Sequence, residues 1–137
     1  INTIPGEDVF YMDCRILPCY RIDDVLSEIK KITKSIETAY RVTIEISIHQ
    51  RVDSAPSTPA DAPVVRALTD AVNRVYQIRA FAGGVGAGTV AAYFRKQGLS
   101  VAVWSKTNMK AHQPDENCPI GNMTGDAKVF AHLFLQA

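Results

Sequence analysis

A proline-rich segment in the middle of the chain constrains the fold more than any other feature of the sequence. Between Arg51 and Pro63 the sequence is RVDSAPSTPADAP, with three prolines among small residues. Proline fixes φ and has no backbone N–H, so a regular helix or a central strand cannot continue through this segment. The composition is typical of a linker. We therefore divide the chain into residues 1–54 and residues 55–137 and predict separate secondary structure in each part.

The part before the linker has the pattern of a β-α-β unit. Residues 9–17 suit a strand that ends at Pro18. Residues 41–50 alternate apolar and polar side chains, which is typical of a half-exposed antiparallel strand. Between them, apolar residues recur at the helical period and predict a helix that begins near Asp23, a favourable N-cap residue. Its apolar positions are Ile22, Val25, Leu26, Ile29, Ile32 and Ile36.

The part after the linker alternates helical patterns with short apolar segments. The sequence predicts a strand over residues 78–81, a helix over 91–96, a buried strand over 100–104 and a last helix from about Thr124 to Leu135. Another helix precedes these elements, with one apolar stripe of Val65, Leu68, Val72 and Val75. This alternation is typical of a parallel sheet covered by helices, so the predicted fold class of the chain is mixed α/β, with an α+β unit in front.

Composition excludes several classes of function. The formal net charge is +1 and 21% of the residues are charged, which gives no electrostatic case for binding nucleic acid or an acidic membrane. No apolar run approaches the roughly 20 residues of a membrane span, and no signal-peptide pattern opens the chain. The cysteines Cys14, Cys19 and Cys118 form an odd set without zinc-finger spacing, which is typical of reduced thiols in a cytoplasmic protein.

A glycine-rich turn, AGGVGAGT at residues 82–89, joins the strand at 78–81 to the next helix. Glycines allow a ligand to approach the backbone closely, and free amides at a helix start attract anions. A dinucleotide fingerprint or a phosphate-binding P-loop is disfavoured, because each needs a different residue where Thr89 stands. The turn fits a carboxylate or a developing oxyanion better, with Thr89 as a plausible N-cap. A tight turn without a ligand stays the alternative.

The segment AHQPDE at residues 111–116 follows the buried strand and contains His112. A neutral imidazole can ligate a metal, and the neighbouring carboxylates can orient it or carry charge. A solvated loop without function is the alternative. A separate zinc site from His112, Asp115, Cys118 and His132 would have mixed ligands at irregular spacing, so it is disfavoured. We interpret His132 as a packed or capping residue of the last helix.

Three motifs in one order resemble the zinc aminoacylase/carboxypeptidase family, which includes succinyl-diaminopimelate desuccinylase and acetylornithine deacetylase. They are NTIPG at residues 2–6 leading to Arg15, GAGT at 86–89 with Phe94, and the AHQPDE segment. The extended match GAGTVAAYFR at 86–95, with VWS downstream, is most similar to the archaeal desuccinylase-like branch.

The resemblance implies a two-domain subunit with an α/β catalytic domain that binds two zinc ions, with cobalt possible, and an inserted lid that mediates dimerisation. Residues 1–54 then correspond to the second half of the lid, and residues 55–137 to the C-terminal part of the catalytic domain. The chain begins at Ile1 without methionine, so we expect the C-terminal part of a longer protein, or otherwise a trimmed mature terminus.

By the same resemblance, His112 matches a metal ligand, whereas the general base and most metal ligands lie upstream, so no catalytic residue is expected in this chain. The matching substrate-binding positions are Asn2, Arg15, Gly88 and Thr89. An arginine fork suits a carboxylate, although a surface ion pair is the alternative for Arg15. Many family members carry aspartate where Ala91 stands here, which leaves the preferred substrate side chain open.

The resemblance predicts a part of a cytoplasmic, homodimeric, metal-dependent amidohydrolase of amino-acid biosynthesis, inactive as this fragment alone. The reaction would remove a succinyl or acetyl group from a small N-acyl amino acid such as N-succinyl-diaminopimelate, without nucleic-acid or membrane partners. Two alternatives remain: a dipeptidase or carboxypeptidase of the same family, and a non-catalytic fragment for structure and dimerisation.

Overall fold

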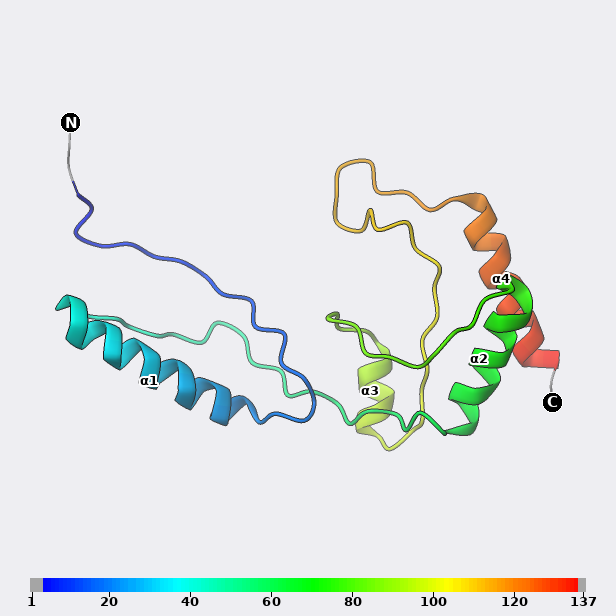
Figure 1. The fold of residues 1–137 in the computed structure, drawn as a ribbon, viewed down its shortest axis with the longest axis horizontal. Coiled ribbons are helices and arrows are strands. Elements are labelled where there is room, and N and C mark those ends of the chain that lie inside the picture. Colours follow the sequence, from blue (N-terminus) through cyan, green and yellow to red (C-terminus); the bar gives the residue numbers. More distant parts are fainter. Residues whose placement is uncertain (1–3, 136–137) are drawn as a thin grey trace. The chain divides into compact units, whose positions relative to one another are not determined.

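The structure, a computed structural model, describes residues 4–135 and contains four helices within that range (Figure 1). They are α1 (Ile22–Tyr40), α2 (Pro63–Tyr76), α3 (Ala91–Lys96) and α4 (Ile120–Leu135). The chain divides into two compact units, of which the first ends at Ser54 and the second begins at Ala55. None of the helices combines the length and the apolar character that crossing a membrane would require.

The first unit is built around α1, as the helical spacing of its isoleucines predicts. The helix begins at Ile22 with Arg21 as the N-cap residue, so Asp23 lies in the first turn and the prediction of an Asp23 cap is wrong. An acidic residue in the first turn is still favourable, because it faces the positive end of the helix dipole. The helix ends at Arg41, which adopts a left-handed conformation with φ 56°.

Polar contacts connect α1 to the chain that follows it. Glu37 Oε1 accepts a hydrogen bond from the backbone N–H of Ile44 at 2.9 Å. Arg51 Nη1 lies 2.7 Å from Asp23 Oδ1. These contacts do not create a core: among residues 4–54 none is buried, and Phe10, for example, is 76% exposed.

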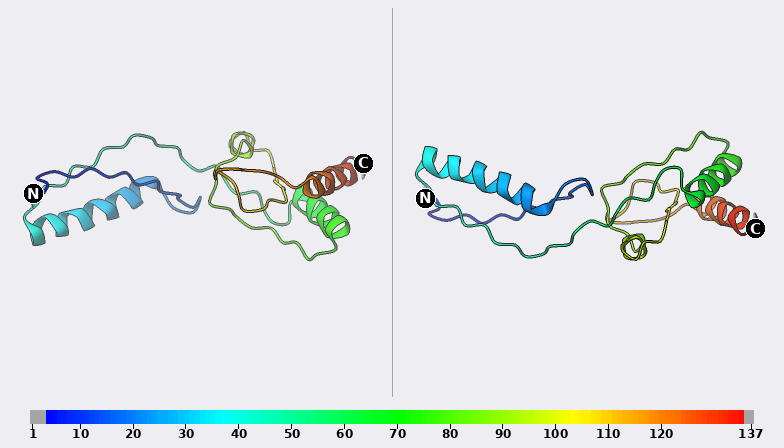
Figure 2. Two further views of the ribbon diagram at one scale, coloured as in Figure 1. Left: turned by 90° about the horizontal axis from the view of Figure 1, so that it is seen from above. Right: turned by 90° about the horizontal axis from the view of Figure 1, so that it is seen from below.

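The second unit has a core in which α2 packs against α4, and both views of Figure 2 show these helices side by side. The predicted stripe on α2 is confirmed, since Val65, Leu68 and Val72 are buried. From α4, Val129 completes the core with an exposed fraction of 0%. The helix α4 begins at Ile120 and not at the predicted Thr124, because the N–H groups of Asn122 and Met123 donate to the carbonyl of Pro119.

The helix α3 has the predicted bounds but a different start. Val90 is the N-cap residue and no side chain caps the helix, so the prediction that Thr89 is the cap is wrong. Thr89 contributes its carbonyl instead, which accepts the N–H of Ala92 at 3.0 Å. Gly98, with φ +80°, follows the helix, and its N–H donates to the carbonyl of Arg95 at 2.9 Å.

The four predicted strands, at residues 9–17, 41–50, 78–81 and 100–104, are irregular segments, and residues 4–135 contain no β-strand. A strand is defined by a ladder of hydrogen bonds to a neighbouring strand, which these segments do not form within the described part. One local substitute for such a ladder occurs at Val101. Its N–H donates to Thr58 Oγ1 at 3.1 Å, and its carbonyl accepts from the same hydroxyl at 2.7 Å. The mixed α/β fold class stays a prediction.

Candidate functional site

His112 lies on a loop of residues 107–119, the orange segment that leads into α4 in Figure 1, and is exposed. Its backbone is left-handed, with φ 61°, and Met109 and Asp115 both have φ 60°. Each such non-glycine residue costs about 1–3 kcal/mol, so the surrounding contacts have to hold the loop in this shape. Strained backbone of this kind clusters at functional sites, which makes the loop a candidate.

Hydrogen bonds within the loop hold this backbone. The N–H of His112 donates to Glu116 Oε2 at 3.1 Å, and the N–H of Glu116 donates to the carbonyl of Gln113 at 3.2 Å. Across the base of the loop, Asn108 Nδ2 donates to Asn117 Oδ1 at 2.9 Å. Glu116 therefore orients His112 through the main chain and not through the ring, contrary to the expectation that neighbouring carboxylates orient the imidazole.

The described residues do not form a complete metal site. Within residues 4–135 no three histidine, cysteine, aspartate or glutamate side chains are grouped to hold a metal ion. The separate site from His112, Asp115, Cys118 and His132 is thus not formed, and His132 is exposed in the last turn of α4 and not packed in the core. A catalytic zinc commonly takes three protein ligands, so this chain alone fits such an ion only as the source of one imidazole.

The predicted substrate-binding residues are distributed over the chain. Asn2 lies outside the described residues. Arg15, in the first unit, contacts Asp13 Oδ2 through Nη2 at 2.6 Å and through Nε at 2.8 Å, so the structure forms the surface ion pair that was the alternative. Gly88 and Thr89 are in the second unit, as is His112. A substrate-binding role for these residues stays a prediction.

The glycine-rich segment contains glycines that its own structure does not require. At Gly86 and Gly88 an added Cβ would meet nothing within 4 Å, and neither residue has a positive φ. Residues 83–88 are all exposed. Neither backbone conformation nor crowding within the described chain therefore explains these glycines, which is compatible with a ligand that approaches this backbone.

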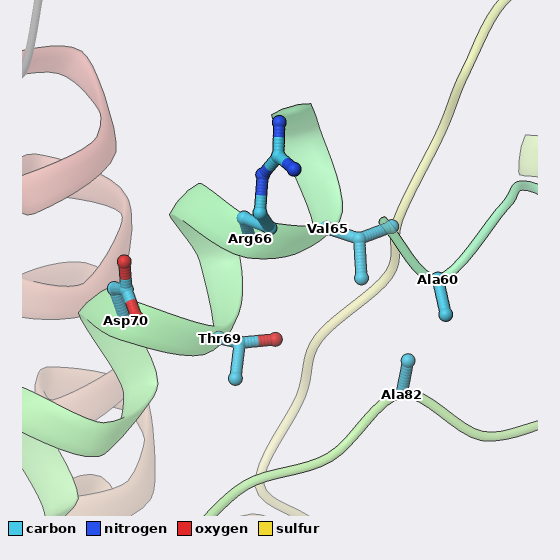
Figure 3. A pocket seen from close by; sticks show the side chains of 6 residues that line it. All are labelled: Ala60, Val65, Arg66, Thr69, Asp70 and Ala82. Carbon is cyan, nitrogen blue, oxygen red and sulfur yellow. The ribbon is translucent and has the colours of Figure 1, made fainter. Parts of the chain in front are cut away.

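A shallow hollow of about 320 Å³ lies beside α2 but does not include the candidate residues (Figure 3). Helix α2 forms one wall, and irregular chain at Ala60 and Ala82 forms the other. Arg66 and Asp70 supply its charged groups. Neither His112 nor Gly88 lines the hollow, so it gives no support to the metal or substrate assignments.

Sequence reasoning missed a hydrogen-bonded cluster around Asp126 on α4. Asp126 Oδ1 accepts from the hydroxyl of Tyr76 at 2.6 Å and from Nε1 of Trp104 at 2.8 Å. Oδ2 accepts from the backbone N–H of Lys106 at 3.0 Å. The rings of Tyr76 and Trp104 also contact each other, with centroids 5.7 Å apart. Gly125 permits this packing, because a Cβ there would collide with the ring of Tyr76.

One signal in the sequence points to this cluster. Asp126 precedes Val129 by three residues and Leu133 by seven, so the helical period places a carboxylate on the apolar face of α4. A half-buried carboxylate needs hydrogen-bond donors, so this position predicts that donors from other segments lie close to Asp126. Nothing in the sequence, however, indicates which donors these are.

The cluster sets the protonation states of its members. Burial raises the pKa of Asp126, but the hydrogen bonds from Tyr76, Lys106 and Trp104 stabilise the carboxylate more, and its pKa lies below the usual 3.8. Burial, together with the hydrogen bond to Asp126, raises the pKa of Tyr76 to about 12. Near neutral pH, Asp126 is therefore an anion and Tyr76 is a neutral donor.

Comparison with known proteins identifies the family. Residues 5–136 match the peptidase family M20/M25/M40, so the chain belongs to this family, and the resemblance read from the sequence is confirmed at that level. An uncharacterized metallohydrolase of Methanocaldococcus jannaschii is 36% identical over 140 residues, which cover 96% of this chain and 34% of the relative. An uncharacterized metallohydrolase of Methanococcus maripaludis is 35% identical over 145 residues, which cover 97% of this chain and 35% of the relative.

The chain thus spans about a third of the length of these curated relatives. No solved structure matches it. The family is one of peptidases, and both of these relatives are described as metallohydrolases. Neither the description of the family nor the names of these relatives specify a metal ion or a substrate.

Proposed function

We propose that this chain is part of a metal-dependent amidohydrolase and supplies one metal ligand, His112. The observation that carries the proposal is the loop at 107–119, where an exposed imidazole stands on a left-handed residue held by the Glu116 side chain. The family and the metallohydrolase relatives support the same chemistry. Because the chain spans about a third of these relatives, the remaining ligands and the general base would come from the other two thirds.

The metal would be zinc, as two ions in the full-length protein, with cobalt as a possible substitute. When bound, zinc lowers the pKa of a bound water and polarises the amide carbonyl. The role of this chain is to bind and to orient. His112 would hold the metal through a ring nitrogen, and the exposed backbone near Gly88 and Thr89 would contact the substrate.

The substrate would be an N-acyl amino acid with a succinyl or acetyl group, such as N-succinyl-diaminopimelate. Arg15 would bind a substrate carboxylate, because a planar guanidinium can donate two parallel hydrogen bonds to it. In that state the substrate carboxylate would replace Asp13, which now occupies the guanidinium. A dipeptide also has a free carboxylate, so a dipeptidase or carboxypeptidase of the same family is the second candidate.

Residues 1–54 would form half of a lid that also dimerises, in a cytoplasmic homodimer, and residues 55–137 would complete an α/β catalytic domain. The exposed apolar side chains of the first unit support a surface that another part of the protein covers. The irregular segments at 78–81 and 100–104 would become strands of a parallel sheet once their neighbours are present.

The test compares His112→Ala with His132→Ala in the full-length protein. Both histidines are exposed and belong to the second unit, so the second variant is a matched control. We expect His112→Ala to lose bound metal and most of the hydrolysis, and His132→Ala to keep both. Metal content and hydrolysis of N-succinyl amino acids, N-acetyl amino acids and dipeptides would be measured together. A folded His112→Ala protein with full metal content would refute the assignment of the ligand.

The same substrate panel separates the alternatives. Preferential hydrolysis of dipeptides would favour the peptidase candidate. A metal-loaded full-length protein without hydrolysis of any compound in the panel would favour a structural role.

A further inference from the structure

We propose that Asp126 and Asn122 of α4 are positioning residues that fix the base of the His112 loop through the backbone of Lys106. In this role both residues act through the backbone of Lys106 and not by direct contact with a substrate or a metal. Their role would be to hold the point at which the chain enters the loop of residues 107–119. The consequence for metal binding rests on the proposed function of His112, whereas the holding of the loop does not.

Lys106 is held at three points. Its N–H donates to Asp126 Oδ2 at 3.0 Å, and its carbonyl accepts from Asn122 Nδ2 at 3.1 Å. Its ammonium nitrogen lies 4.6 Å from the centroid of the Tyr76 ring, in a cation–π contact. Both backbone groups of this residue are therefore bound by side chains of one helix, and the hydrogen bond to the carboxylate is charge-assisted.

The other end of the loop is connected to the same helix. Residue 119 is followed directly by α4, and the carbonyl of Pro119 accepts the N–H of Asn122 at 2.9 Å. Asn122 and Asp126 are one helical turn apart and share a face. The loop thus begins after Lys106, which Asn122 and Asp126 bind, and ends at α4 itself. Both of its ends are therefore attached to the first turns of α4.

The loop needs a fixed base because its backbone is strained. Met109, His112 and Asp115 all have left-handed φ angles, which relax when the ends of the loop are released. A shift of Lys106 would therefore change the direction in which the imidazole of His112 projects. Metal ligation depends on such directions, and outer residues that orient a ligand affect metal affinity.

The two carboxylate oxygens of Asp126 divide their partners in a way that permits a clean test. Oδ1 accepts from Tyr76 and Trp104, and Oδ2 accepts from Lys106. In Asp126→Asn a single acceptor oxygen remains, and the two donors Tyr76 and Trp104 favour its placement on their side, so the amino group faces the Lys106 N–H and cannot accept from it. In Tyr76→Phe the ring and both Lys106 hydrogen bonds remain, and the variant loses only the hydroxyl, which donates to Asp126 Oδ1 at 2.6 Å and lies 3.2 Å from the carbonyl oxygen of Asn122. A purely structural cluster would respond to both variants, whereas a positioning pair responds only to those that release Lys106.

The experiment measures hydrogen–deuterium exchange in the full-length protein at the backbone amides of His112 and Glu116, which are hydrogen-bonded within the loop. We expect exchange in this loop to become about tenfold faster or more in Asp126→Asn and in Asn122→Ala. We expect no change in Tyr76→Phe, nor in Asp70→Asn, which makes the same carboxylate-to-amide change at an exposed position of α2. Asn122→Ala leaves the Asp126 carboxylate intact, so it keeps the test decisive if Asp126→Asn does not fold.

A second readout is the affinity for Co²⁺ and the absorption spectrum of the bound ion, with His112→Ala as the reference. Weaker binding in Asp126→Asn and Asn122→Ala, with normal binding in Tyr76→Phe, supports the inference. Equal acceleration of loop exchange in all three variants of the cluster, or no acceleration in any, overturns it. If the loop responds as expected but His112→Ala binds Co²⁺ normally, the positioning of the loop stands and the proposed function fails.

Discussion

Within residues 4–135 the two units contain similar amphipathic helices, yet only the second unit has a core. In the second unit α2 packs against α4, and Val72 and Val129 are almost completely buried. In the first unit α1 has no buried residue, and Ile32 is 58% exposed. This difference shows that the apolar stripe of a helix forms a core only where another element of the same chain packs an apolar face against it.

The contacts that hold the first unit are different in kind. Most of them are exposed ion pairs and hydrogen bonds, such as Arg51 with Asp23 and Ser54 Oγ with the carbonyl of Ile16. Exposed pairs of this kind contribute little to stability, because water competes with each partner. The comparison therefore predicts that the stability of the 137-residue chain resides in residues 55–137.

The largest expected effect of this difference is in backbone protection. We expect amides at Ala71, Val72 and Val129 to exchange with deuterium about a hundredfold more slowly than amides in the middle of α1. Burial is the reason, since Ala71 and Val129 are both 0% exposed. Site-resolved exchange by NMR on the 137-residue chain measures this. Protection of α1 equal to that of α2 would break the comparison and would point to a partner that covers α1.

The helices were predictable because their signal is local. The apolar spacing in α1 and α2 indicates which segments are helical, and the structure confirms both of those predictions and the helix predicted at 91–96. The ends of the helices were less predictable. Helix α4, for example, begins directly after Pro119, whose carbonyl accepts the N–H groups of Asn122 and Met123. Capping depends on such backbone partners as much as on residue type, which is why Asp23 and Thr89 were misjudged.

The strands and the candidate site depend on partners that a single segment does not specify. An alternating pattern at 41–50 indicates which face is apolar, but the hydrogen-bond partner has to come from elsewhere. The motif around His112 locates a candidate ligand, yet its left-handed φ and its bond to Glu116 follow only from the folded loop. The Asp126 cluster joins three separate segments, so only the tertiary structure identifies it.

A smaller effect is expected from a pair of truncations, Val129→Ala and Ile32→Ala. Val129→Ala removes two buried carbon groups from the core, which costs about 2 kcal/mol of the free energy of unfolding. Ile32→Ala removes exposed carbon from α1 and should change it by less than about 0.5 kcal/mol. Urea unfolding of the 137-residue chain followed by circular dichroism measures both. A larger loss for Ile32→Ala than for Val129→Ala would reverse the comparison between the units.

The smallest expected effect separates two aspartates whose pKa values both lie below the usual 3.8. The hydrogen bond and the charge of Arg51 lower the pKa of Asp23 in the first unit. In the second unit burial raises the pKa of Asp126, but hydrogen bonds from Tyr76, Lys106 and Trp104 lower it further. Since the pKa is lower in the folded state, each carboxylate stabilises its unit above about pH 4, and the contribution is lost as the pH falls through the folded pKa.

Salt should distinguish the two carboxylates, because their partners differ. At 1 M NaCl the Debye length is about 3 Å, so the exposed charge of Arg51 is screened and the pKa of Asp23 should return toward 3.8. Asp126 depends mainly on a hydroxyl, an indole and a backbone N–H, which are uncharged donors, so its pKa should stay low. Carbon-detected NMR titration of both carboxyl groups at low and high salt measures the shifts, with Asp126→Asn used to assign the signal. An Asp126 pKa that rises with salt as much as that of Asp23 would mean that the nearby Lys106 ammonium, and not the hydrogen bonds, controls the second unit's carboxylate.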